Sequence, residues 1–262
     1  MCNYNRRIVQ KLKNTNRQRT RKMTDDNDEI KRFLESIPDK FQILEEGINI
    51  ELQKEYLDYS DSFGHGQITD EEVDRFGAIL FRPDVPDEQK KKGLTILAHV
   101  GTISAFKQLS KFYANADKQL KQWSALALNE CKMFLESELL EESIGFISTG
   151  LGGTRDKLRI YFLVLPIDGK AFDPQKHKII GSELSHVAKE LNCEIENFDF
   201  QELYTGLTVL IPMDVAVATF IDNGIQCCNE FGNFVLEHYY AANTEIPDKK
   251  EIEEIIKIVR EG

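Results

Sequence analysis

The chain of 262 residues contains 41% hydrophobic and 29% charged residues and carries a formal net charge of −11. This length favours two domains, and the composition is that of proteins that bury a hydrophobic core. No apolar run is long enough to cross a bilayer and the first residues lead into no apolar segment, which argues against a membrane or secreted protein and favours the cytoplasm.

The charges are distributed unevenly along the chain. Residues 1–22 hold eight basic residues and no acidic one, so the 25 basic and 44 acidic residues that remain leave the rest of the chain with a net charge of −19. Such an acidic body is not expected to bind polyanions, whereas the basic segment has the composition of a tail that lies along RNA or an anionic surface. The alternative is that Met23 begins the natural protein, and in both cases residues 1–22 are predicted to be disordered.

The folded part begins with a helical domain, which we expect over residues 23–142. Apolar residues at three- and four-residue spacing predict helices over 28–36 and 41–59. A further helix is expected after Thr69, because Glu72 three residues later completes a capping-box pattern.

Residues 61–72, between two of these helices, are similar to an EF-hand calcium loop. They have an acid at position one, a glycine at position six and Glu72 at position twelve. Phe63 and His65 occupy positions three and five, where the motif needs side-chain oxygens, so a calcium ion would lose two ligands. We therefore predict a helix–loop–helix turn here and no metal.

The helical pattern is clearest over residues 86–140. There Leu97-Ala98-His99-Val100-Gly101 and, further on, Trp123-Ser124-Ala125-Leu126-Ala127-Leu128 resemble HEAT-type helical hairpins. In such hairpins a glycine separates the helices, and small alanines let antiparallel helices pack closely. The resemblance spans roughly 55 residues, which is too few for a solenoid of stacked units, so it implies a small HEAT-like helical bundle.

The periodicity changes in the second half, which we assign to an α/β domain over 143–262. The expected elements are strands over 144–149, 158–166, 193–200, 207–213 and 233–241 and helices over 177–191, 215–228 and 249–260. Asp214 is expected to cap the helix that follows it. From residue 158 the order is β-α-β-β-α-β, which resembles the ferredoxin-like split βαβ fold.

The predicted fold class is therefore α+β, with an N-terminal HEAT-like helical bundle followed by a C-terminal ferredoxin-like α/β sandwich. This fold carries no function by itself, because many unrelated activities use it.

Residues 148–159, Ser-Thr-Gly-Leu-Gly-Gly-Thr-Arg-Asp-Lys-Leu-Arg, form the most distinctive string of the chain. Three glycines expose backbone N–H groups and cationic side chains follow, which is typical of a cradle for an anion or a phosphate. The string lacks the ending of a Walker loop, and the strand that follows it also excludes a dinucleotide fingerprint. The candidate ligand-binding residues are Thr149, Gly150, Gly152, Gly153, Thr154, Arg155, Lys157 and Arg159.

The three cations of this string alternate along the chain. The period of a strand would place Arg155, Lys157 and Arg159 on one face, where together they could clamp an anion. The alternative is a tight β-turn whose glycines supply positive φ and whose cations pair with acids such as Asp156 or those of residues 136–142. Together with Trp-Ser-Ala-Leu-Ala-Leu-Asn-Glu at 123–130, the string resembles an uncharacterised bacterial protein family of unknown activity, so this resemblance implies no chemistry.

No signature of catalysis or metal binding occurs elsewhere in the sequence. Five cysteines, an odd number without metal-ligand spacing, are expected to be reduced thiols, and the five histidines do not pair at helical spacing. No hydrolase elbow, zinc-protease or kinase motif is present. Catalytic residues stay unknown, and we expect no cofactor.

These observations rank three functions. The first is a non-catalytic interaction or regulatory protein that binds a partner protein or a small anionic ligand. The second is an enzyme or nucleotide-binding protein that uses residues 150–159. The third is an RNA- or ribosome-associated factor, because Tyr161 and Tyr239 could offer bases a stacking surface on the sheet. The open edges of such a sheet often pair between subunits, which favours a homodimer.

Overall fold

The computed structural model describes residues 40–62 and 68–261. The basic segment, the predicted helix over 28–36 and the centre of the calcium-like loop lie outside the described residues. Two compact units divide the described chain: 40–44 with 48–148, and 45–47 with 149–261. Helices and strands are mixed, which confirms the α+β class. None of the helices in these ranges is both long and apolar enough to span a membrane.

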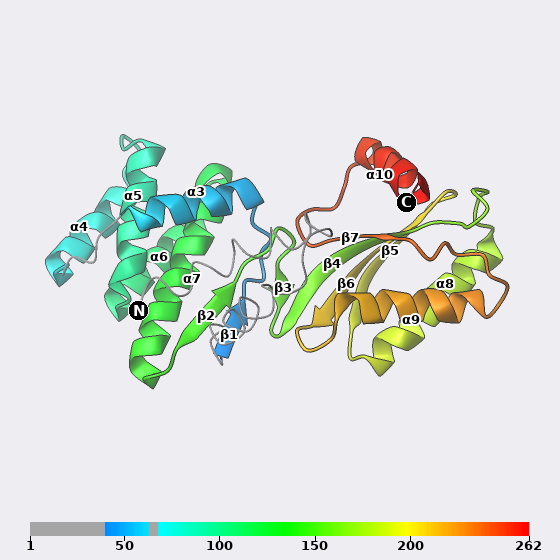
Figure 1. The fold of residues 1–262 in the computed structure, drawn as a ribbon. Coiled ribbons are helices and arrows are strands. Elements are labelled where there is room, and N and C mark those ends of the chain that lie inside the picture. The colour runs from blue at the N-terminus through cyan, green and yellow to red at the C-terminus, as the bar shows by residue number, and fades with distance from the viewer. Residues whose placement is uncertain (1–39, 63–67, 262) are drawn as a thin grey trace, which may run out of the picture. The chain divides into compact units, whose positions relative to one another are not determined.

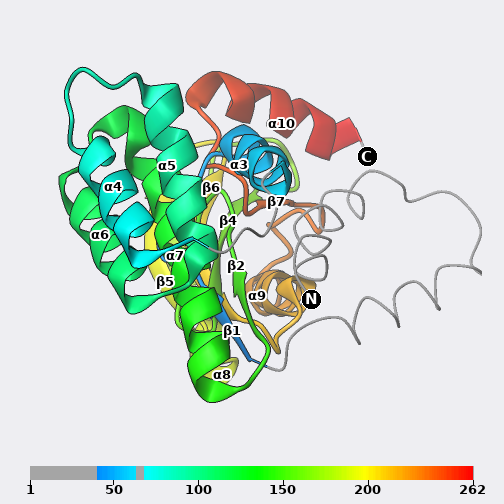
Figure 2. The same ribbon diagram turned by 90° about the vertical axis from the view of Figure 1, so that its left-hand side faces the viewer.

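The first unit is built mainly of helices. They are α3 (Ile50–Asp61), α4 (Asp70–Leu80), α5 (Asp87–Val100), α6 (Ile103–Asn115) and α7 (Lys118–Leu140). Helices α5, α6 and α7 lie side by side, and α3 runs across α7 (Figure 1, Figure 2). The predicted capping box at the start of α4 is present, because Thr69 accepts from the Glu72 N–H and the Glu72 carboxylate accepts from the Thr69 N–H.

Trp123 is the centre of the core of this unit. Its indole is fully buried, and the rings of Tyr56 and Tyr59 meet it edge-on with ring centroids 5.1 and 5.6 Å away. The indole Nε1–H donates to the Thr95 hydroxyl at 3.3 Å, so its one donor is satisfied. Between α5 and α6 the backbone turns at Gly101 with a φ of 60°, a conformation that favours glycine.

The predicted helix over 41–59 is wrong in its first half. Here β1 (Lys40–Ile43) is a strand that pairs in parallel with β2 (Ile144–Ile147). The helix begins only at Ile50, because the Asn49 side chain accepts hydrogen bonds from two N–H groups of the first turn. Pairing with residues about a hundred positions later decides the conformation of β1, and local spacing carries no trace of that pairing.

The second unit is a five-stranded antiparallel sheet with helices on both faces (Figure 1). Its strands are β3 (Gly153–Thr154), β4 (Lys157–Val164), β5 (Glu194–Phe200), β6 (Thr205–Pro212) and β7 (Tyr240–Ala242). Their order is β3-β4-β6-β5, and β7 pairs with β4 on the side away from β6. The helices are α8 (Pro174–Glu190), α9 (Val217–Asn229) and α10 (Lys249–Glu261).

The side chains of β4 alternate between the two faces of this sheet. Ile160, Phe162 and Val164 join the core formed with α8 and α9, whereas Tyr161 and Leu163 pack toward α10 on the opposite face (Figure 1). Strand β4 is therefore buried on both sides, and this burial fixes the position of the turn that precedes it.

Two predicted helix starts in this unit are wrong. Helix α8 begins at Pro174, earlier than predicted, because the Asp173 side chain caps its first turn and proline is tolerated there. Helix α9 begins at Val217, and its cap position is Ala216 instead of Asp214, with no side-chain cap hydrogen bond.

The predicted strand over 233–241 is reduced to β7 at its end. The Asn229 side chain accepts hydrogen bonds from the N–H groups of Phe234 and Val235 and donates to the Val235 carbonyl oxygen. Beside these three bonds, Val235 forms a single antiparallel bridge with Pro166, so apolar alternation there gives one isolated bridge and no full strand before β7.

Candidate functional site

The glycine-rich loop owes two of its glycines to close packing between backbones. A Cβ on Gly150 would overlap the carbonyl oxygen of Thr244, and a Cβ on Gly152 would overlap that of Glu45. Gly152 also has a φ of 69°, which glycine adopts without strain. Both positions therefore need glycine for a structural reason.

Several polar groups of this loop are already in use within the second unit. The Leu151 N–H donates to the Asn243 carbonyl oxygen at 3.0 Å, and the Gly152 N–H donates to the Thr149 carbonyl oxygen at 3.3 Å. The Thr149 hydroxyl donates to the Gly152 carbonyl oxygen at 3.2 Å. These bonds use polar groups of the loop within the protein, so fewer backbone N–H groups are available to an anion than the sequence predicts.

The three cations after the loop do not line one strand face. Strand β4 begins at Lys157, so Arg155 lies in the preceding turn, where its φ is 53°. Lys157 and Arg159 share a face of β4, but the period-two expectation fails for Arg155 because the strand starts after it.

Lys157 and Arg159 are each paired with a carboxylate of β5. Lys157 Nζ lies 2.6 Å from Glu194 Oε1, and the Lys157 side chain is 8% exposed. Arg159 donates to both oxygens of Glu196, at 2.5 and 2.8 Å, and this hydrogen bonding raises the pKa of the guanidinium. The alternative of pairing with acids therefore holds for both cations, but the partners come from β5 instead of Asp156 or residues 136–142.

A hollow of about 440 Å³ lies beside this turn. It is lined by Thr154, Arg155, Asp156, Lys157, Asn192 and Glu194. Arg155 is exposed at the hollow, and within the part of the chain that the structure describes no side chain pairs with it. Thr154, Arg155 and Lys157 are therefore the predicted ligand residues that the structure brings together at one hollow.

The other predicted residues do not line this hollow. They are Thr149, Gly150, Gly152, Gly153 and Arg159. Sequence reasoning missed Asn192 and Glu194, which reach the turn because β5 follows α8 and pairs through β6 with β4. Asn192 has a φ of 54°, and an asparagine just after a helix does signal such a left-handed turn, but nothing local places it beside Arg155.

The two tyrosines considered for base stacking do not form one surface. Tyr161 is buried under α10, whereas Tyr239 packs against Phe162 in the core on the opposite face, with ring centroids 6.2 Å apart. A continuous stacking platform requires aromatic rings exposed on the same face.

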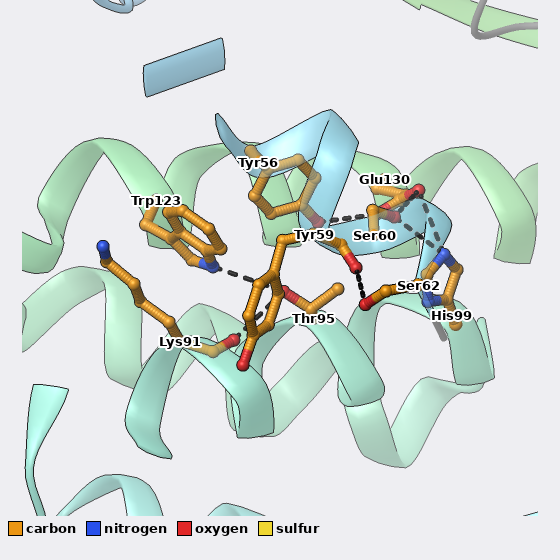
Figure 3. Close-up of polar contacts among 9 residues, drawn as sticks. All are labelled: Tyr56, Tyr59, Ser60, Ser62, Lys91, Thr95, His99, Trp123 and Glu130. Atoms are coloured by element: carbon orange, nitrogen blue, oxygen red, sulfur yellow. Dashed lines mark hydrogen bonds and ion pairs between the residues drawn. The ribbon is translucent and has the colours of Figure 1, made fainter. Parts of the chain in front are cut away.

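A second polar cluster lies inside the first unit, between α3, α5 and α7 (Figure 3). The Tyr56 hydroxyl donates to Glu130 Oε2 at 2.5 Å, and the Ser60 hydroxyl lies 3.0 Å from His99 Nε2. Glu130 Oε1 is 3.5 Å from the same His99 nitrogen and 3.4 Å from the Ser60 hydroxyl. The four side chains point toward one another and are almost completely buried.

This cluster has the residue types of a nucleophilic relay but not the geometry. A relay needs the hydroxyl at one imidazole nitrogen and the carboxylate at the other, whereas Ser60 and Glu130 both approach Nε2 of His99. The cluster instead ties three helices together through a shared buried carboxylate. Within residues 40–62 and 68–261, no three His, Cys, Asp or Glu side chains are grouped so that they could hold a metal ion.

Comparison with known proteins shows little similarity. No protein-family model matches the chain, and no curated protein matches it. A candidate transposase from Deinococcus radiodurans R1 is 10% identical with a TM-score of 0.35, over 39% of this chain and 91% of that protein. A REP-associated tyrosine transposase bound to a REP hairpin is 9% identical with a TM-score of 0.30, over 38% of this chain and 63% of that protein. At these TM-scores neither likeness supports a conclusion on fold or function.

Proposed function

We propose that the protein is a non-catalytic interaction or regulatory protein whose second unit binds a small anionic ligand in the hollow beside Arg155. The observation that supports this function is an exposed guanidinium without a partner in the described chain, next to a sheltered ammonium. A hollow of about 440 Å³ also has the size of a small-molecule site.

An anion that enters the hollow would take the place of the Glu194 carboxylate. The Glu194 side chain is 60% exposed, while the Lys157 ammonium that it contacts is sheltered. A phosphate or carboxylate would displace the solvent-exposed carboxylate, take over the contact with Lys157 and add one with Arg155. The Thr154 hydroxyl and the Asn192 amide would then supply further donors.

The finer architecture belongs to the same proposal. We infer that the second unit is a ferredoxin-like domain, which the sheet order β7-β4-β6-β5 supports, with α8 following β4 and α9 following β6. We also infer that the first unit is a HEAT-like bundle that binds a partner protein, for which the antiparallel-hairpin pattern around Gly101 is the support.

Thermal unfolding in the presence of nucleotides, phosphorylated metabolites and inorganic phosphate tests the proposal. A ligand at one hundred times its Kd adds about 2.7 kcal/mol to the stability of the unit that binds it. We expect a stabilising compound in the panel, loss of its effect in Arg155→Ala, and a stronger effect in Glu194→Gln, which removes the competing charge. Lys170→Ala, an exposed cation that does not line the hollow, is the matched control. No stabilisation by any compound, or equal stabilisation of wild type and Arg155→Ala, would overturn it.

A further inference from the structure

A second hollow, of about 500 Å³, lies in the same unit but shares no residue with the first. Helix α9 and the segment after it form its lining, which includes Asp222, Ile225, Gln226, Asn233, Glu237 and His238. Neither the proposed function nor the comparisons assign a role to it.

The wall of this hollow is held in place from within. The Asn229 side chain makes three hydrogen bonds to Phe234 and Val235, at 2.8 to 3.0 Å. Phe234 and Val235 are buried, and the backbone on either side bonds to the extension of β4, through Ile167 N–H to Phe234 O and Leu236 N–H to Leu165 O. The segment that carries Asn233, Glu237 and His238 is therefore anchored in the core before any ligand arrives.

The charged groups that line the hollow are two carboxylates, and the polar side chains of Gln226, Asn233 and His238 can donate or accept hydrogen bonds. Asp222 and Glu237 each bring a carboxylate, and in the described chain neither forms an ion pair with a lysine or arginine. No lysine or arginine lines the hollow, whereas Gln226 and Asn233 add amide oxygens. Ile225, which is 5% exposed, is the aliphatic side chain among the lining residues. The negative charge of the two carboxylates favours a cationic ligand, and the aliphatic side chain of Ile225 favours a cation that carries an alkyl group.

We propose that this hollow binds an organic cation, an alkylguanidinium or alkylammonium group. The guanidinium or ammonium N–H groups would donate to Asp222 and Glu237, and the alkyl part would lie over Ile225. Such a group occurs both in free small amines and guanidines and in lysine or arginine side chains of a peptide. The hollow recognises the cation in either source.

Titration of the full chain followed by amide NMR shifts tests this proposal directly. The probes are butylguanidinium, butylammonium and the peptide acetyl-Gly-Arg-Gly-amide, at low ionic strength because exposed charges are screened by salt. We expect shifts confined to residues of α9 and the following segment, and about tenfold weaker binding in Asp222→Asn/Glu237→Gln, which loses both charge-assisted bonds. The exposed carboxylates of Glu202 and Asp214 provide the matched control, Glu202→Gln/Asp214→Asn, which changes the net charge equally and should bind like wild type.

The outcomes separate the sources and the competing explanations. Binding of the small cations and the peptide alike supports the shared chemistry, and binding of the peptide without the small cations identifies a protein partner as the source. Equal binding by wild type and Asp222→Asn/Glu237→Gln, or shifts spread over the whole acidic surface, overturns the proposal. Tighter binding of Mg²⁺ or Ca²⁺ at the same residues overturns it as well. All four substituted side chains are exposed, so the variants should keep the wild-type melting temperature.

Discussion

Lys157 and Glu194 form an ion pair across the strand that lies between their own two strands. Lys157 begins β4 and Glu194 begins β5, and β6 runs between these two strands, yet the ammonium and the carboxylate are 2.6 Å apart. Arg159 and Glu196 also pair across β6, where Leu210 is the register partner of Arg159 and Glu196 lies at the bulge between Ile195 and Asn197. Two charge pairs therefore bridge β6, whose Leu210 is buried.

The Lys157–Glu194 pair should contribute modestly to stability. We expect Glu194→Gln to lower the free energy of unfolding of the second unit by about 1 kcal/mol, because Glu194 is largely solvated while Lys157 loses its countercharge. Hydrogen exchange of β4 and β6 amides measures this change. Lys157→Met is the matched variant: it removes the buried charge itself, so it should cost less than Glu194→Gln. A larger cost for Lys157→Met would show that the ammonium has stabilising contacts beyond this pair.

Removal of the buried carboxylate in the first unit should be much more costly. Glu130→Ala removes the carboxylate shared by Tyr56, Ser60 and His99 and opens a cavity among α3, α5 and α7, so the free energy of unfolding should fall by about 3–5 kcal/mol. Fluorescence of Trp123, the single tryptophan, reports urea unfolding of this unit. Glu138→Ala changes an exposed acid on the same helix and should shift the unfolding midpoint little. Similar midpoints for the two variants would contradict a structural role of the cluster.

The stability of the first unit should decrease in alkaline solution because of Cys131. Burial raises the pKa of this thiol from 9.0 to about 12. Above pH 9 the unfolded thiol loses its proton while the folded one keeps it, so the contribution of the thiol to stability is complete below pH 9 and is lost as the pH rises toward 12. The slope approaches about 1.4 kcal/mol per pH unit. Urea unfolding followed by Trp123 fluorescence at about pH 8, 9 and 10 in reducing buffer measures it, and Cys131→Ala should flatten the dependence.

Gly150 should tolerate no side chain. In Gly150→Ala the new Cβ would meet the Thr244 backbone oxygen, which cannot move without displacing the chain, and we expect a loss of about 3 kcal/mol or more in the second unit. Gly181→Ala is the control, because its Cβ would make an ordinary 3.4 Å contact with Phe200 and alanine favours the helix by about 0.5–1 kcal/mol. Circular dichroism during thermal unfolding distinguishes the two. If Gly150→Ala melts like wild type, the backbone of Thr244 does not press on the loop.

The parts of the fold that the sequence predicts are those that depend on neighbours in the chain. The Thr69–Glu72 capping box and the apolar residues of β4 are such cases, because their cause lies within a few positions. Strand β1 escaped prediction because its partner β2 follows about a hundred residues later. The sequence also does not predict the anchoring role of Asn229, because an asparagine side chain near a helix end can form hydrogen bonds with several different backbone groups.

The candidate site shows the same division. The string 148–159 marks the turn, and Thr154, Arg155 and Lys157 do line a hollow there. Glu194 and Glu196 of β5 neutralise Lys157 and Arg159. Only the order of strands in the sheet brings β5 near these two cations. Alternating charge correctly predicts that Lys157 and Arg159 share a strand face, but it predicts neither the start of the strand after Arg155 nor the carboxylates that pair with the two cations.

Residues 45–47 belong to the second unit although their neighbours on both sides, Leu44 and Ile48, belong to the first. During translation these three residues are synthesised about a hundred positions before the glycine loop against which they pack. The second unit therefore contains a segment that is synthesised long before its last strand and helix. Because this segment lies between two parts of the first unit in the sequence, no single proteolytic cut can separate the two units intact. A fragment that starts at Thr149 lacks the Glu45 backbone beside Gly152, so expression of that half in isolation should yield a frayed loop at its N-terminal end.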